Sequence, residues 1–160
     1  MLYFAYGSNL YSKRLKSRVP SATKVAAVSL PDYELFFDKR GTDGSGKGNI
    51  RKTNDSIVYG VIYEINAEEK VTLDRIEGAG YDDVSLQIPV GSELIKVFTY
   101  MAKESHTDDS LNPYSWYKNL IIAGAKENNL PEEYINEIQE VEAIKDPEEE
   151  RAKLELKILE

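Results

Sequence analysis

The sequence has no cysteine and only one histidine, His106, among its 160 residues. The absence of cysteine excludes disulfides, thiol catalysis, and zinc or iron–sulfur sites bound by thiolates. His106 lies in a polar stretch between Ser105 and Thr107, with no second metal ligand and no base partner nearby. A serine–histidine–aspartate triad would need this histidine, and no nucleophile-elbow motif accompanies it. We therefore expect His106 at the surface and no metal site.

Long apolar runs and basic clusters are also missing. No stretch approaches the roughly 20 apolar residues that span a bilayer, and the N-terminus has neither a basic segment nor a cleavage site. We therefore expect no membrane segment and no secretion signal, which makes the cytoplasm the expected location. The net charge is −8 at pH 7 and no basic stripe is present. This balance is unfavourable for nucleic-acid binding.

The residues that are present suit one domain with an acidic end. Hydrophobic residues make up 41% and charged residues 30% of the chain, and the length predicts a single domain over residues 1–160. Residues 131–160 carry 11 Asp and Glu against 4 Lys and Arg. We expect this region to be an acidic helical C-terminal segment with a solvated face. The sequence does not decide whether the protein forms a homodimer, since no exposed apolar stripe can be identified.

Residue patterns predict strands and helices in an order typical of an α+β fold. The apolar and β-branched runs predict strands over residues 2–6, 24–30, 33–37, 57–65, 84–90 and 93–100. Helical periodicity and capping residues predict helices over 10–19, 66–77, 113–129 and 131–141, and favour a helix over a strand after Asp146. Because helices do not alternate with strands throughout, we expect a small curled mixed sheet or barrel with helices packed outside.

The opening stretch predicts a strand, a tight turn and a helix N-terminus. Gly7 breaks the apolar strand, and Ser8 and Asn9 are both favourable N-cap residues for a helix whose apolar stripe begins at Leu10. Such a turn directs free backbone N–H groups and the helix dipole at one point, which suits a carboxylate or an oxyanion. The alternative is that Gly7 only connects a strand to a capped helix.

Glu77 is the candidate acid–base residue. It shares a helix face with Leu73 and Ile76, which are expected in the core, and Gly78 ends the helix directly after it. Partial burial and the C-terminal end of a helix dipole both raise the pKa of a carboxyl group. A general acid or base near neutral pH needs such a raised pKa. The alternative is a Glu77 that reaches solvent or pairs with a lysine.

Two further patterns carry weaker signals. Tyr117 offers a hydroxyl on the helix after Pro113, but the local sequence does not distinguish it from a core tyrosine such as Tyr114. Residues 41–47 match the phosphate-loop spacing G-x-x-x-x-G-K, but Gly48 stands where magnesium binding needs Ser or Thr, and no helix former follows. We expect residues 38–49 to form a mobile loop, and the sequence leaves open whether residues 41–49 close over a substrate. Nucleotide binding is a third hypothesis.

Three segments resemble the γ-glutamylcyclotransferase family, which includes γ-glutamylamine cyclotransferases, the butirosin-pathway cyclotransferase and the plant AIG2-like proteins. The first segment is the opening YFAYGSNL over residues 3–10. The second is LDRIEG over residues 73–78, preceded by YGVIYE over 59–64. The third begins with YKN at residues 117–119 and continues as GAKENNLP over 124–131, a pattern similar to animal γ-glutamylcyclotransferases.

The resemblance implies a barrel-centred α+β fold without metal or cofactor. It also implies conversion of a γ-glutamyl amino acid, a small-molecule substrate, to 5-oxoproline and the free amino acid. Glu77 matches the catalytic glutamate of the family. The implied substrate-binding residues are Tyr3, Phe4, Ala5, Tyr6, Gly7, Ser8, Asn9, Leu10 and Tyr117. The rival hypotheses are the same ring closure on a γ-glutamylamine or a γ-glutamyl biosynthetic intermediate, and a non-catalytic binding domain of the same fold.

Overall fold

The chain folds around its shortest strand, β1, and the computed structural model describes residues 1–160. The strands are β1 (Leu2–Ala5), β2 (Thr23–Arg40), β3 (Gly46–Glu64), β4 (Tyr81–Val90) and β5 (Glu93–Ala102). The helices are α1 (Ser12–Arg18), α2 (Ala67–Glu77), α3 (Ser115–Glu127), α4 (Glu132–Glu140) and α5 (Glu149–Leu156). Three short 3₁₀ turns are also present: η1 (Ser8–Leu10), η2 (Glu104–His106) and η3 (Lys157–Leu159). The predicted α+β class is confirmed.

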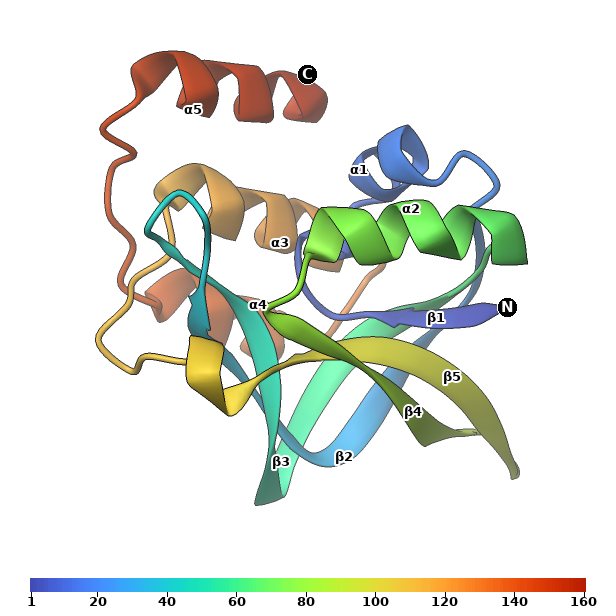
Figure 1. Ribbon diagram of the computed structural model, residues 1–160. Coiled ribbons are helices and arrows are strands. Elements are labelled where there is room, and N and C mark those ends of the chain that lie inside the picture. Colours follow the sequence, from blue (N-terminus) through green and yellow to red (C-terminus); the bar gives the residue numbers. More distant parts are fainter.

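The five strands form one mixed sheet in the order β2-β3-β1-β5-β4. Strand β1 pairs antiparallel with β3 and parallel with β5, while β2–β3 and β4–β5 are antiparallel hairpins. The sheet curls but stays open, with β2 and β4 as its edges. The curled mixed sheet is therefore confirmed and the closed barrel is wrong. Figure 1 shows α1, α2 and α3 on the same side of β1, with α5 lying beyond α3.

The β2–β3 hairpin differs most from expectation. Strand β2 is continuous across Pro31, with register shifts at three places that let it bend, where two separate strands were predicted. The long predicted loop over residues 38–49 is wrong as well, because only residues 41–45 lie between the two strands. Pairing with the partner strand overrides the high glycine content of this segment. In Figure 1 the hairpin tip rises beside α3, where the Gly46 N–H donates to the Asn112 carbonyl at 2.9 Å.

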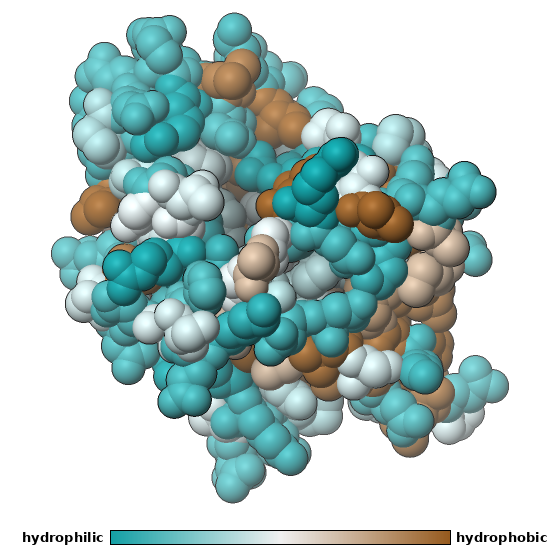
Figure 2. Space-filling model, viewed as in Figure 1, coloured by the Kyte–Doolittle hydropathy of each residue, from teal (hydrophilic) through white to brown (hydrophobic).

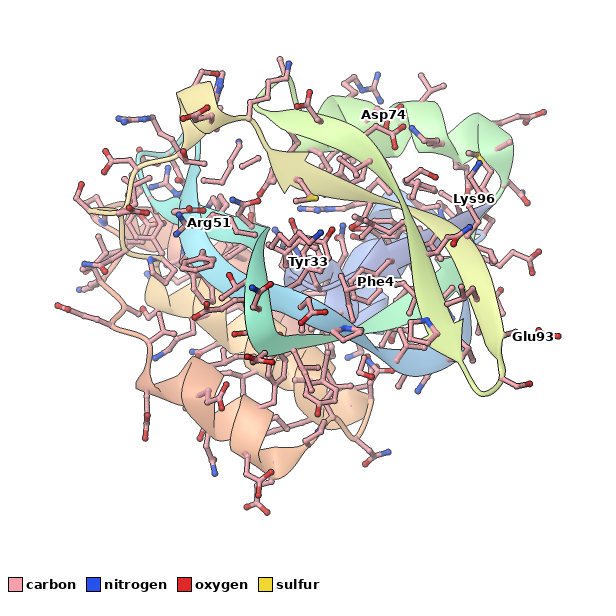
Figure 3. All side chains as sticks on the ribbon, turned by 90° about the horizontal axis from the view of Figure 1, so that it is seen from below. Phe4, Tyr33, Arg51, Asp74, Glu93 and Lys96 are labelled. Atoms are coloured by element: carbon pink, nitrogen blue, oxygen red, sulfur yellow. The ribbon has the colours of Figure 1, made fainter.

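Apolar side chains fill both sides of the sheet. The larger core lies between the sheet and the helices and includes Leu15, Tyr63 and Leu120, and the smaller one lies within the curl of the sheet around Phe4. Figure 3, seen from below, shows Phe4 enclosed by the strands. Gly60 of β3 has no room for a Cβ atom, which would lie 2.4 Å from the Phe4 ring. The glycine is needed for this close approach, and the register of β3 is regular there.

The first helix starts later than predicted. A 3₁₀ turn follows Gly7, and α1 begins only at Ser12, so neither Ser8 nor Asn9 caps it. Helix α3 explains the difference, because Gly124 packs against the Leu10–Tyr11 backbone so closely that a Cβ would lie 2.4 Å from the Tyr11 nitrogen. The Leu10 carbonyl also accepts hydrogen bonds from Tyr63 and Asn128. Contacts with distant parts of the chain therefore prevent this turn from forming the first turn of a regular α-helix.

The predicted end of α2 is confirmed, whereas two details of that helix are wrong. Gly78 ends the helix with a φ of 82°, a conformation that favours glycine. Asn66 and Glu69 have the spacing of a capping box, which the sequence predicts at the start of this helix, but the box does not form, because Glu69 accepts hydrogen bonds from Ser21. Leu73 is fully buried as predicted, but Ile76 is 41% exposed.

The surface is largely polar. Figure 2 shows a mostly hydrophilic face with apolar side chains in separate patches. None of the helices combines the length and the apolar character that crossing a bilayer requires. The C-terminal region is helical as predicted, but it is more than a solvated face, since Tyr134, Ile135 and Ile138 of α4 and the Asp146 side chain are buried.

Candidate active site

One pocket at the C-terminal end of β1 brings together residues from seven elements of the fold. Its lining residues are Tyr3, Tyr6, Gly7, Ser8, Asn9, Gly48, Glu77, Tyr81, Tyr100 and Tyr117. Seven of these ten were expected at the site from the sequence. The strand β1 and the turn after it supply one wall, and the ends of α2 and α3 supply two more. The predicted residues at positions 3, 6–9, 77 and 117 therefore meet in space although they are far apart in the chain.

Glu77 has the environment expected of an acid–base group. Its side chain is only 18% exposed, and its carboxylate lies 3.5 Å from the Arg18 guanidinium. Burial raises the pKa of the Glu77 carboxyl above its ordinary value, and this effect outweighs the opposing influence of Arg18 and Asn9. A carboxyl group that exchanges a proton closer to neutral pH can act both as base and as acid.

Asn9 fixes the position of Glu77. Its Nδ2 donates to Glu77 Oε1 at 3.1 Å and to the Tyr3 hydroxyl at 3.0 Å, while its Oδ1 accepts from Arg18 at 3.0 Å. Both ends of the amide are thus used, and the residue is almost completely buried. The turn after β1 is therefore joined to the last turn of α2 through one side chain.

Tyr117 and Gly48 form the opposite wall. The Gly48 N–H donates to the Tyr117 hydroxyl at 2.9 Å, and a Cβ at position 48 would lie 3.2 Å from that oxygen. Tyr114 is different, because its hydroxyl donates to the Asp43 carbonyl in the hairpin tip. The structure therefore distinguishes the two tyrosines, which the local sequence does not.

The hydroxyl groups in the pocket stay protonated. Burial raises the pKa of the Tyr3, Tyr6, Tyr81, Tyr100 and Tyr117 hydroxyls. They are therefore neutral hydrogen-bonding groups over the whole pH range in which proteins function.

The turn after β1 also carries unused backbone donors. The carbonyls of Gly7 and Ser8 accept from Leu10 and Tyr11, and none of the turn, loop or side-chain hydrogen bonds uses the N–H groups of Gly7, Ser8 or Asn9. Buried N–H groups are normally paired, so these three are available to an anionic or carbonyl ligand. The donors expected from the sequence are present, although a 3₁₀ turn supplies them and not the start of an α-helix.

Three of the expected site residues lie elsewhere. Phe4, Ala5 and Leu10 are fully buried and do not line the pocket, so their contact with a ligand stays a prediction. Phe4 points to the opposite face of β1 from Tyr3, because side chains alternate along a strand. The side chains of these residues belong to the hydrophobic cores next to the turn after β1.

Sequence reasoning missed several residues around the site. Tyr81 and Tyr100 face each other across the β4–β5 hairpin, and no local signal separates them from other strand tyrosines. Arg14 and Arg18 did have a signal, since they lie four residues apart on the helix after the turn. Arg14 donates to the Ser8 hydroxyl at 3.1 Å and to Glu155 of α5 at 2.6 Å.

The glycine-rich segment is not a phosphate loop. It forms the tip of a β-hairpin, and a strand follows it where a phosphate loop requires a helix. Lys47 is paired with Asp43 at 2.7 Å. The nucleotide-binding hypothesis is therefore wrong for this segment. No three acidic, histidine or cysteine side chains come close enough together to hold a metal ion.

The chain was compared with known families and proteins. The pattern that defines the AIG2-like family matches residues 57–138. Gamma-glutamylcyclotransferases from Bos taurus and Homo sapiens are each 33% identical over 147 residues, which cover 88% of this chain and 78% of theirs. A solved structure of a gamma-glutamyl cyclotransferase superposes with a TM-score of 0.83 at 28% identity, covering 96% of this chain and 98% of that one. The chain therefore belongs to the γ-glutamylcyclotransferase and AIG2-like family.

Proposed function

We propose that this protein is a γ-glutamylcyclotransferase, which converts a γ-glutamyl amino acid into 5-oxoproline and the free amino acid. Its similarity to named enzymes over most of the chain supports the activity. The observation that carries the proposal is the position of Glu77, a largely buried carboxyl with a raised pKa on the wall of a pocket that also offers free backbone donors.

The reaction needs a folded substrate and a deprotonated amine. The α-amine of the glutamyl group attacks the carbonyl carbon at the other end of the same side chain, so the nucleophile is already tethered. The pocket must mainly hold the chain in ring geometry, which removes much of the entropic barrier. The tyrosine hydroxyls and the walls formed by Gly48 and Asn9 give the pocket its shape.

Glu77 moves the proton that the reaction requires. As a carboxylate it accepts a proton from the substrate ammonium, which frees the nitrogen lone pair for attack on the carbonyl. The carbon–nitrogen bond to the leaving amino acid then breaks as Glu77 returns this proton to the departing nitrogen. The ring nitrogen gives up a second proton, which also passes to the departing nitrogen, so the products are 5-oxoproline and an amino acid with a protonated amine. The raised pKa of Glu77 suits both steps.

The free N–H groups of Gly7, Ser8 and Asn9 stabilise the negative charge of the bound species. Donors that are already in place cost no reorganisation when charge develops on the carbonyl oxygen. The same groups suit the α-carboxylate of the glutamyl group, and the two assignments differ in which end of the substrate lies against the turn.

Incubation of the purified protein with γ-glutamyl-alanine, followed by measurement of 5-oxoproline, tests the proposal. We expect turnover by the wild type and a loss of about 10²- to 10⁴-fold in kcat for Glu77→Gln, which keeps the shape of the side chain but cannot exchange a proton. Glu68→Gln is the matched control, because Glu68 is exposed on the same helix. Full turnover by Glu77→Gln would remove Glu77 from its role.

The rival substrates are tested in the same assay. Release of 5-oxoproline from a γ-glutamylamine or a larger γ-glutamyl conjugate, and none from γ-glutamyl-alanine, would favour the other branches of the family. Binding of these compounds without turnover would favour a non-catalytic domain. The cytoplasmic location and a homodimer stay predictions, which cell fractionation and sedimentation would test.

A further inference from the structure

A second hollow adjoins the pocket and is rich in positive charge. It shares Ser8, Glu77, Tyr81 and Tyr117 with the inner pocket, so the two form one continuous space. Its other lining residues are Arg14, Arg18, Lys39, Gly41, Thr42, Lys47 and Ile76. This outer pocket lies between α1, the end of α2 and the β2–β3 hairpin tip. Glu77 lines both hollows and therefore lies at the boundary between them.

Three of the four cations in the outer pocket already have partners. Arg14 pairs with Glu155 at 2.6 Å, and Lys47 pairs with Asp43 at 2.7 Å. Arg18 donates to Asn9 and faces Glu77. The charges of these three side chains are therefore already compensated by groups of the protein.

Lys39 is the exception. The residue is only 7% exposed, yet its ammonium makes no ion pair and no hydrogen bond with the protein. Burial lowers the pKa of the Lys39 ammonium, against the opposing influence of Glu77 and Asp43. The ammonium lines the outer pocket without a counter-ion from the protein, so it is available to a ligand of opposite charge there.

The position of the Lys39 side chain is fixed on several sides. Its Nζ lies 4.7 Å from the centre of the Tyr81 ring, and a Cβ at Gly80 would lie 2.8 Å from its Cε. Its backbone pairs with Lys47 of β3 and forms a bridge to Thr107. The ammonium is therefore held at one place in the outer pocket.

We propose that Lys39 binds the α-carboxylate of the leaving amino acid, and so selects γ-glutamyl amino acids over γ-glutamylamines. The inference rests on the proposed function, in which the leaving nitrogen lies beside Glu77. In an α-amino acid the carboxylate is two bonds from that nitrogen, and so lies just beyond Glu77, on the side of the outer pocket. A γ-glutamylamine has no carboxylate there and would leave Lys39 without a partner.

The test compares two substrates that differ only in this charge. The kcat/KM values of the wild type and of Lys39→Met are measured with γ-glutamyl-alanine and with γ-glutamyl-alaninamide. Methionine keeps an unbranched stem against Tyr81 and Gly80 but removes the ammonium. We expect Lys39→Met to lose about 10- to 100-fold in kcat/KM on γ-glutamyl-alanine, and to change less than about threefold on the amide.

Arg40→Gln is the matched control, because Arg40 is the next residue of β2 and its side chain is 58% exposed. We expect it to keep the wild-type preference for the acid. Equal losses of Lys39→Met on both substrates, or no loss on either, would overturn the assignment. A wild type that releases 5-oxoproline from neither compound would overturn the proposed function and this assignment together, whereas wild-type turnover with an unchanged Lys39→Met would overturn this assignment alone.

Discussion

The amide of Asn9 and the carboxylate of Glu77 lie 3.1 Å apart, although 68 residues separate them in the chain. The hydrogen bond joins the turn after β1 to the end of α2. It also stabilises the charged form of Glu77, and so holds the pKa of that carboxyl below the value that burial alone would give.

Replacement of Asn9 by leucine removes this donor at nearly constant volume. We expect the pKa of Glu77 to rise further, and the acidic limb of the kcat/KM profile to move to higher pH, because the free enzyme needs Glu77 ionised. Asn66→Leu is the control, since Asn66 is exposed and its side chain makes no hydrogen bond. An Asn9→Leu profile that overlays that of the wild type would contradict this role.

Tyr117→Phe tests the opposite wall of the pocket. Loss of the hydroxyl leaves the Gly48 N–H unpaired, at a cost of about 1–3 kcal/mol. We expect a lower kcat/KM together with a lower free energy of unfolding. Tyr114→Phe removes a comparable hydrogen bond, at 2.9 Å to Asp43, but outside the pocket. If the two variants lost the same stability and the same activity, Tyr117 would have no role beyond the fold.

Glu77→Gln is expected to be more stable than the wild type at neutral pH. The pKa of Glu77 in the folded protein lies above its ordinary value of 4.5, so the folded state keeps a proton that the unfolded state has already lost. The stability of the wild type therefore falls as the pH rises through this interval. Glutamine stays neutral and avoids the loss. The Tm difference between the two proteins should be larger at about pH 8 than at about pH 4. A difference independent of pH would contradict the raised pKa.

Gly124→Ala should destabilise the fold by forcing α3 away from the turn after β1. A Cβ there would lie 2.6 Å from the Leu10 carbonyl carbon and 2.4 Å from the Tyr11 nitrogen, both of them backbone atoms. Overpacking of this kind costs about 1–3 kcal/mol. Urea unfolding measures the loss, with Lys126→Ala as an exposed control on the same helix. Stability equal to that of the control would show that the helix shifts without strain.

Local signals were enough to predict the end of α2 and its glutamate. The apolar spacing at Leu73 and the stop at Gly78 both act within a few residues, so neither depends on distant contacts. The hairpin could not be predicted in the same way. The glycines near its tip favour a loop, and only pairing between β2 and β3 keeps residues as far as Arg40 and from Gly46 onward in strands.

The site could be predicted only in part for the same reason. Ser8, Asn9 and Glu77 lie in sequence patterns that the family resemblance identifies. Lys39 does not, because its significance comes from the missing counter-ion, and counter-ions are assigned only once the chain is folded. Two residues of the signature, Phe4 and Leu10, are buried in the two cores, which the resemblance alone does not indicate.

The contact between Arg14 and Glu155 gives the end of the chain an influence on the pocket. Arg14 also holds Ser8, so the charge of α5 acts on the turn after β1 through one guanidinium. The buried Asp146 accepts hydrogen bonds from Trp116 of α3 and from Arg151 of α5, and so fixes the start of α5 against α3. Substitution of Glu155 is therefore expected to alter the turn after β1 through Arg14, although Glu155 itself does not line the pocket.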